Sequence, residues 1–241
     1  MQSFMPVAAI AVVMFYLVWV YRNRTRGGAP VKAAPGMDRL WELLFADQSL
    51  SDFLSEQPGV TWPELREALE AGRRGKNDDA VAALKKALAA PNLETRVALL
   101  IWNSLREIGE SPSAAEAEVV QGVVVEIPIQ RDAVVLAVYR DGRARLFSWR
   151  GKALLWEPTG DEEVSSLLER VLADSQALFF MAQPGRKCTA IPEGTNRVTL
   201  LTFGGIRTFD ARKSDPLALD SSVGALIKAL TARETKSVQG G

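Results

Sequence analysis

Side chains suited to catalysis are few, because the 241-residue chain contains no histidine and only one cysteine. Without imidazole, the Ser-His-Asp and Cys-His nucleophile pairs and every histidine-containing metal site are excluded. Cys188 follows Arg186 and Lys187, two cations that favour a reactive thiolate. No base stands beside it in the sequence, so we interpret Cys188 as an incidental loop residue.

Three consecutive acids, Asp161, Glu162 and Glu163, are a candidate site for a divalent metal. They also stand at the start of a predicted helix, where the helix dipole favours anions, so we interpret them as structural. Nucleotide-binding glycine motifs, EF-hand loops, paired thiolates and zinc-protease motifs do not occur in the sequence. The sequence therefore predicts no catalytic residue, no metal site and no cofactor.

One predicted strand combines cations with aromatic rings. Its alternation places Arg143, Arg145, Phe147 and Trp149 on one face, a candidate partner surface. Such a face fits an acidic protein partner or single-stranded nucleic acid. The alternative is structural: the rings pack in a core while the arginines line a solvated edge. From residue 121 onward sixteen bases face fourteen acids, a balance that argues against nucleic acid.

The amino terminus predicts a membrane anchor. Eighteen uncharged residues from Phe4 to Tyr21 would form about 27 Å of helix, close to the ~30 Å thickness of a hydrocarbon core. Trp19 and Tyr21 are typical of the interface. The cations that follow are Arg22, Arg24 and Arg26. Basic flanks stay in the cytoplasm, so we expect the lipid bilayer as a partner, the amino terminus outside and the rest cytoplasmic.

The sequence disfavours two alternatives to an anchor. A cleaved signal peptide has its basic residues before the apolar run, whereas here they follow it. A buried soluble helix would show a polar face, which the run lacks.

The remaining chain divides by composition and periodicity. We expect an anchor with its basic flank in 1–26, a Gly- and Pro-rich linker in 27–37, an acidic helical module in 38–119 and an α+β domain in 120–241. Within the module, Thr61 and Glu64 form a capping box, Asn77 caps a second helix, and a third helix spans 93–108. Residues 38–120 carry fifteen acids and nine bases, a balance unsuited to phosphate backbones.

Part of the module resembles a known repeat. In 61–92 the small, packing and terminating positions of a tetratricopeptide helix pair are matched by Gly75, Ala80, Leu84, Ala87 and Pro91. A 34-residue period extends this resemblance, in degenerate form, to 61–118. It implies a concave protein-binding surface. An ordinary helical hairpin bundle is the alternative.

From residue 121 the pattern becomes that of strands, in the order β-β-β-β-α-β-β-α. Hairpin signals such as Asp141-Gly142 join the strands, and a second capping box, Thr159 with Glu162, starts the first helix. This order predicts the α+β class, with an antiparallel sheet and helices on one face. The stretch 102–156 is also similar to an uncharacterised family of membrane-anchored bacterial proteins, a resemblance that implies no activity.

Taken together, these features predict a membrane-tethered cytoplasmic adaptor or scaffold that binds a protein partner and is not an enzyme. One alternative is a sensor that holds a small molecule between the sheet and its helices. Another is a hydrolase that uses carboxylates alone.

The charge asymmetry around the predicted span leads to a topology prediction. A reporter fused to the carboxyl end should be active in the cytoplasm, and the full-length chain should remain in the membrane fraction. Mature protein that begins after residue 21 and lies free in an oxidising compartment would contradict this.

Overall fold

The computed structural model describes residues 44–46, 48–56, 62–129, 132–148, 153–185, 190–214 and 217–239. The predicted span, its basic flank and the linker 27–37 lie outside these residues. Within the described ranges, no helix is long and apolar enough to cross a bilayer. The anchor therefore stays a prediction from the sequence.

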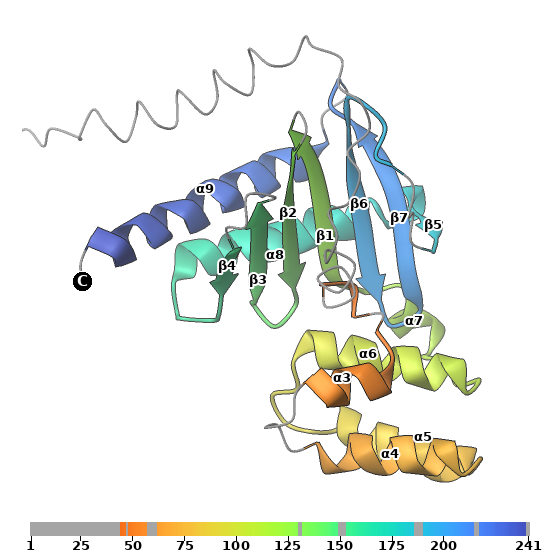
Figure 1. The fold of residues 1–241 in the computed structure, drawn as a ribbon. Coiled ribbons are helices and arrows are strands. Elements are labelled where there is room, and N and C mark those ends of the chain that lie inside the picture. The colour runs from red at the N-terminus through yellow and green to blue at the C-terminus, as the bar shows by residue number, and fades with distance from the viewer. Residues whose placement is uncertain are drawn as a thin grey trace, which may run out of the picture.

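Helices make up the amino-terminal part of the described chain (Figure 1). They are α3 (Leu50–Glu56), α4 (Pro63–Arg73), α5 (Asn77–Leu88), α6 (Thr95–Glu107) and the short α7 (Ala114–Ala117). Leu65, Leu84, Leu100, Ile101 and Leu105 lie in one buried cluster that joins α4, α5 and α6. Burial of these apolar side chains is what holds the helices together.

Three details of this module differ from the sequence expectations. The cap position of α4 is Trp62, which gives no side-chain hydrogen bond there, so the predicted capping box of Thr61 with Glu64 is wrong. Asn77 is the first residue of α5, not its cap; Lys76 takes the cap position and gives no side-chain hydrogen bond there. The chain 34 residues after α5 forms only α7 and the start of a strand. The period therefore does not produce a second helix pair of equal length.

The described strands form one seven-stranded antiparallel sheet in the order β4-β3-β2-β1-β6-β7-β5. They are β1 (Val120–Ile129), β2 (Asp132–Tyr139), β3 (Ala144–Ser148), β4 (Ala153–Trp156), β5 (Gln183–Pro184), β6 (Thr195–Thr202) and β7 (Gly205–Arg212). The α+β class is confirmed. Among the described strands, the sequence analysis missed only the two-residue β5. This strand follows a 3-10 turn, η1 (Phe179–Met181).

Helices α8 (Glu162–Ala177) and α9 (Ala218–Gln239) cover one face of the sheet (Figure 1). The cluster beneath them includes Val123, Leu136 and Leu200 from the strands, with Leu168 and Leu226 from the helices. The cap of α8 is Asp161, whose carboxylate accepts from the Val164 N–H. The predicted capping box of Thr159 with Glu162 is therefore wrong, because the cap and the first residue of the helix lie two residues later than that box requires.

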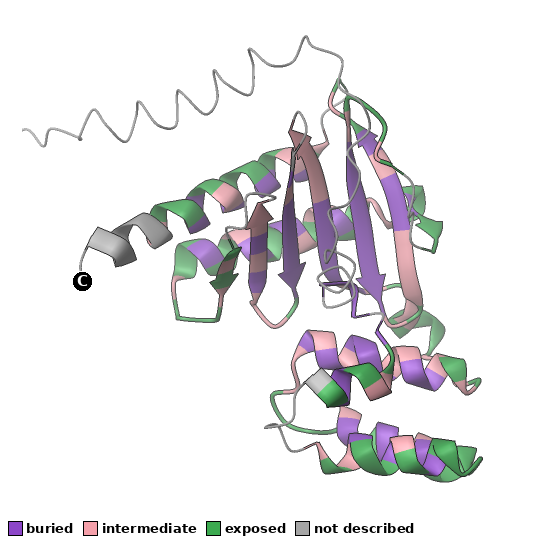
Figure 2. Ribbon diagram, in the orientation of Figure 1, coloured by how far each residue is buried: buried purple, intermediate pink, exposed green. Residues whose placement is uncertain are grey.

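The strands are buried along much of their length (Figure 2), and residues of the helical module contribute to the burial of the face opposite α8 and α9. Leu44, Phe45 and Leu99 of the module pack with Val124, Val135 and Leu201 of the strands in one cluster. The fully buried Tyr139 donates its hydroxyl to the carbonyl of Leu44 at 2.8 Å. Its ring lies against Gly122, where an added Cβ would meet the ring at 3.0 Å. Burial raises the pKa of Tyr139, so the hydroxyl stays a donor.

Polar contacts fix α6 to the lower end of the sheet. The Asp141 carboxylate accepts from the Thr95 N–H at 2.8 Å, and Thr95 Oγ1 accepts from the Asp141 N–H at 3.1 Å. Asp141 thereby satisfies a free amide in the first turn of α6. At the other end of α6, Arg106 donates to the carbonyl of Phe203 at 2.6 Å, and burial lowers its pKa.

The position of these clusters predicts that the part beyond the linker folds alone. All three clusters consist of residues at or beyond Leu44, so deletion of 1–36 removes none of them. Fragment 37–241 should be monodisperse in gel filtration without detergent and should unfold cooperatively in circular dichroism. Aggregation in the absence of detergent would contradict this.

The exchange between Asp141 and Thr95 gives a stability prediction in the same fragment. Asp141→Ala should lower the free energy of unfolding by about 1–2 kcal/mol, because it leaves the Thr95 N–H in the first turn of α6 without its acceptor. Glu157→Gln is the control, since Glu157 is half-exposed and pairs with the same arginine, Arg143; its cost should stay within ~1 kcal/mol. Equal costs in urea denaturation would show that the cap does not hold α6.

Candidate functional site

The α4–α5 hairpin is the candidate site, and its sequence explains its shape. Pro63 occupies the first turn of α4, where its missing N–H costs nothing. Gly75 takes a left-handed backbone angle, φ 71°, in the tight connection to α5. Leu65 and Leu84 turn inward to the module core, so the stripes opposite them remain in solvent.

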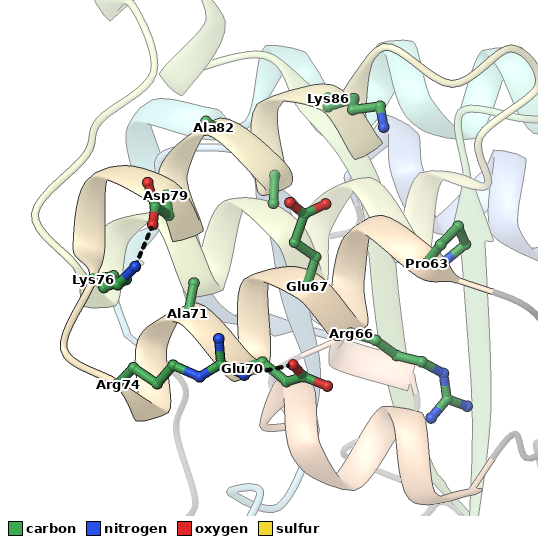
Figure 3. A pocket seen from close by; sticks show the side chains of 11 residues that line it. Pro63, Arg66, Glu67, Glu70, Ala71, Arg74, Lys76, Asp79, Ala82 and Lys86 are labelled. Carbon is green, nitrogen blue, oxygen red and sulfur yellow. Dashed lines mark hydrogen bonds and ion pairs between the residues drawn. The ribbon is translucent and has the colours of Figure 1, made fainter.

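Those exposed stripes enclose a groove, here called the hairpin groove (Figure 3). Its cavity has a volume of about 560 Å³. The lining residues are Pro63, Arg66, Glu67, Glu70, Ala71, Arg74, Lys76, Asp79, Ala82, Ala83 and Lys86. The alanines contribute small apolar side chains to the lining, and most of the other lining residues are charged. A second cavity, beside Phe45 and Leu99, has about 10 Å³, room for no more than one water.

Ion pairs occupy the rim of the hairpin groove. Arg74 pairs with Glu70 at 3.1 Å, and Lys76 pairs with Asp79 at 3.6 Å. Lys86 pairs with Glu64 at 3.3 Å, and the pKa of Glu64 is lowered first by its backbone N–H and then by Lys86. These pairs are exposed and contribute little to stability. They do fix where each charge lies.

Arg66 and Glu67 differ from the other charged residues of the groove. Both are exposed, and neither makes an ion pair with a residue that the structure describes. Glu67 reaches into the space between the two helices, whereas Arg66 points outward along α4 (Figure 3). A bound segment would therefore meet Glu67 inside the groove and Arg66 at its outer rim, two charges of opposite sign without a described ion-pair partner.

The predicted partner surface on β3 has a different environment from the one expected. Arg143 pairs with Asp141 at 3.0 Å and with Glu157 at 2.7 Å, and Arg145 pairs with Glu157 at 2.6 Å. Their side chains are only 23% and 11% exposed. Burial lowers the pKa of Arg143, but Glu94, Asp141 and Glu157 outweigh it and the net shift is upward.

The two aromatic members of that surface are placed less fully. Phe147 is half-buried and packs at the margin of the cluster around Tyr139. Trp149 lies outside the described residues. A partner-binding role for these four residues stays a prediction, while the arginines already serve contacts within the chain.

The acids at the start of α8 have a structural role in the described chain, and Cys188 is not described. Arg233 of α9 reaches Asp161 at 2.9 Å and Glu163 at 2.6 Å, and its hydrogen bond is the main cause that lowers the pKa of Asp161. Within the described ranges, no three acids or thiols gather as metal ligands would. Cys188 lies outside those ranges.

The hairpin groove was not predicted from the sequence. In the sequence, the charged residues of α4 were counted only as part of an acidic module. The available signal was their spacing: Arg66, Glu70 and Arg74 recur every four residues and so share one helix face. Which face of a hairpin stays uncovered depends on the tertiary packing.

Comparisons of the chain with protein-family models, with curated proteins and with solved structures find no match. Its function must therefore be inferred from its own residues.

Proposed function

We propose that this chain is a membrane-tethered cytoplasmic adaptor whose helical module binds a segment of a protein partner in the hairpin groove. The observation that carries the proposal is the groove itself, an open cavity of about 560 Å³ on a hairpin that lies at the end of the module away from the sheet. Its rim carries charges that ion pairs hold in place. A protein segment is a ligand that fits an open groove with charged walls of this kind.

The composition of the groove indicates the chemistry of that segment. Ala71, Ala82 and Ala83 have small side chains, so the backbone of a bound segment can approach the helices closely. Arg66 and Glu67 offer one charge of each sign without a described ion-pair partner. The segment should therefore carry both an acid and a base. Such pairing sets orientation and specificity more than affinity.

The resemblance of 61–92 to a tetratricopeptide helix pair supports a protein ligand, because that resemblance implies a protein-binding surface. In this proposal one hairpin, rather than an array of repeats, carries the surface. The α+β domain acts as the rigid body onto which the hairpin's neighbour α6 is fixed through Asp141 and Arg106.

The predicted span supplies the membrane part of the proposal. A span followed by Arg22, Arg24 and Arg26 would hold the module at the cytoplasmic surface. The tether confines the groove to a thin layer of cytoplasm, so a partner in the same membrane meets it at a high effective concentration.

A charge reversal in the groove tests the proposal. Arg66→Glu should abolish recovery of the partner when the full-length chain is purified from detergent-solubilised membranes, because the wall then repels the partner's acid. Arg73→Glu is the matched control: Arg73 lies on the same helix and is exposed, but it does not line the groove. Both variants should keep the thermal midpoint, since exposed charge changes cost within ~0.5 kcal/mol.

Three results would contradict the proposal. The first is a stoichiometric partner that survives Arg66→Glu unchanged, and the second is one lost equally in both variants. The third is the absence of any stoichiometric partner from the unaltered chain.

A further inference from the structure

An exposed aromatic turn lies at the end of the sheet where β5 forms the edge. Phe180 is 79% exposed and the adjacent Met181 is 41% exposed, both in the 3-10 turn η1. Among the described residues, the other exposed large apolar side chain is Leu155, at 62%, on the opposite edge strand β4. Phe180 and Met181 are adjacent, so together they form the one described place where two large apolar side chains are exposed side by side in the sequence.

The turn is rigidly built, so the exposure of Phe180 does not come from a loose chain. Arg207 of β7 donates from Nε and Nη2 to the carbonyl of Ala182, at 3.1 and 2.9 Å, and its guanidinium lies 4.7 Å from the centre of the Phe179 ring. The Met181 N–H donates to the carbonyl of Leu178 at 3.0 Å. These contacts hold the chain on both sides of Phe180 in place.

The segment that contains the turn has no charged residue, and hydrogen bonds hold both of its ends. From Gln176 to Gly185 the chain has no charged residue. At one end, Gln176 accepts from the Val120 N–H and donates to the carbonyl of Glu118. At the other end, the Gly185 N–H donates to the carbonyl of Ile206. An uncharged segment with an outward aromatic ring suits the boundary between lipid headgroups and acyl chains.

The predicted tether identifies the bilayer as the surface that meets this turn. The 16 residues between Tyr21 and the predicted start of the helical module at residue 38 reach up to ~50 Å when extended at ~3.3 Å per residue, which leaves the domain free to turn its η1 side to the membrane. A tethered domain meets the bilayer without a loss of translational freedom, so a contact of two side chains is sufficient.

We propose that the η1 turn, with Phe180 at its tip and Met181 beside it, inserts into the cytoplasmic surface of the bilayer as a second membrane contact. This inference rests on the tether of the proposed function and adds an orientation to it. The domain would lie with the β5 edge of the sheet against the membrane. The hairpin groove, on another part of the chain, would remain open to a protein partner.

Fluorescent labelling of the full-length chain in phosphatidylcholine vesicles tests this contact. In a Cys188→Ser background, Phe180→Cys and Leu155→Cys each carry one environment-sensitive fluorophore. The label at 180 should shift its emission to shorter wavelength and lose intensity to a quencher attached to lipid chains. The label at 155, which starts from comparable exposure, should respond to an aqueous quencher instead.

Carbonate washing of the same vesicles separates this inference from the tether. If the chain resists extraction while both labels respond as if in water, the turn does not touch the bilayer and the tether stands. If carbonate extracts the unlabelled chain, the tether is wrong and the turn proposal falls with it. Quenching by lipid at both positions would show non-specific adsorption and would also overturn the proposal.

Discussion

The central strands of the sheet bury side chains on both faces, and this double burial determines the rest of the structure. Val123, Val124 and Val125 are consecutive and all buried, so an apolar side chain of β1 points to each side. Helices α8 and α9 cover one face. The other face needs a second cover, which Leu44, Phe45 and Leu99 of the helical module provide. The module and the sheet are therefore joined by a shared core cluster, reinforced by Tyr139 and Asp141.

That arrangement determines which surfaces of the molecule remain exposed and which charged side chains are paired within the chain. Because α6 is committed to the sheet, the α4–α5 hairpin lies farther out and keeps one side uncovered (Figures 1 and 2). Arg143, just before β3, and Arg145, within it, form ion pairs with nearby acids. One of these acids, Asp141, also accepts a hydrogen bond from the first turn of α6. The β5 edge of the sheet presents the apolar turn η1. The groove proposed for partner binding and the turn proposed for membrane contact thus lie on separate elements.

Local patterns predicted most of the fold. The observed order of long strands and helices beyond residue 119 agrees with the predicted order, and it led to the α+β class, because two-residue and 3.6-residue periods are local properties. The cover on the second face was missed, although the run Val123–Val125 carried a signal of two-sided burial. Cap positions at Thr159 and Asn77 were misplaced, since neighbouring polar residues compete for them. The pairing of Arg145 with Glu157 and the exposure of the hairpin groove depend on tertiary contacts that no local pattern encodes.

The central claim is that the hairpin groove is the surface that a protein partner occupies in the cell. It is tested most directly by replacing Ala82, in the groove, with a photoreactive amino acid in the full-length chain and irradiating living cells. A matched substitution at Ala232, an exposed residue of α9, is the reference. The account predicts one covalent adduct of reproducible mass from position 82 and none from 232. No adduct at 82, or the same adduct from both positions, would contradict it.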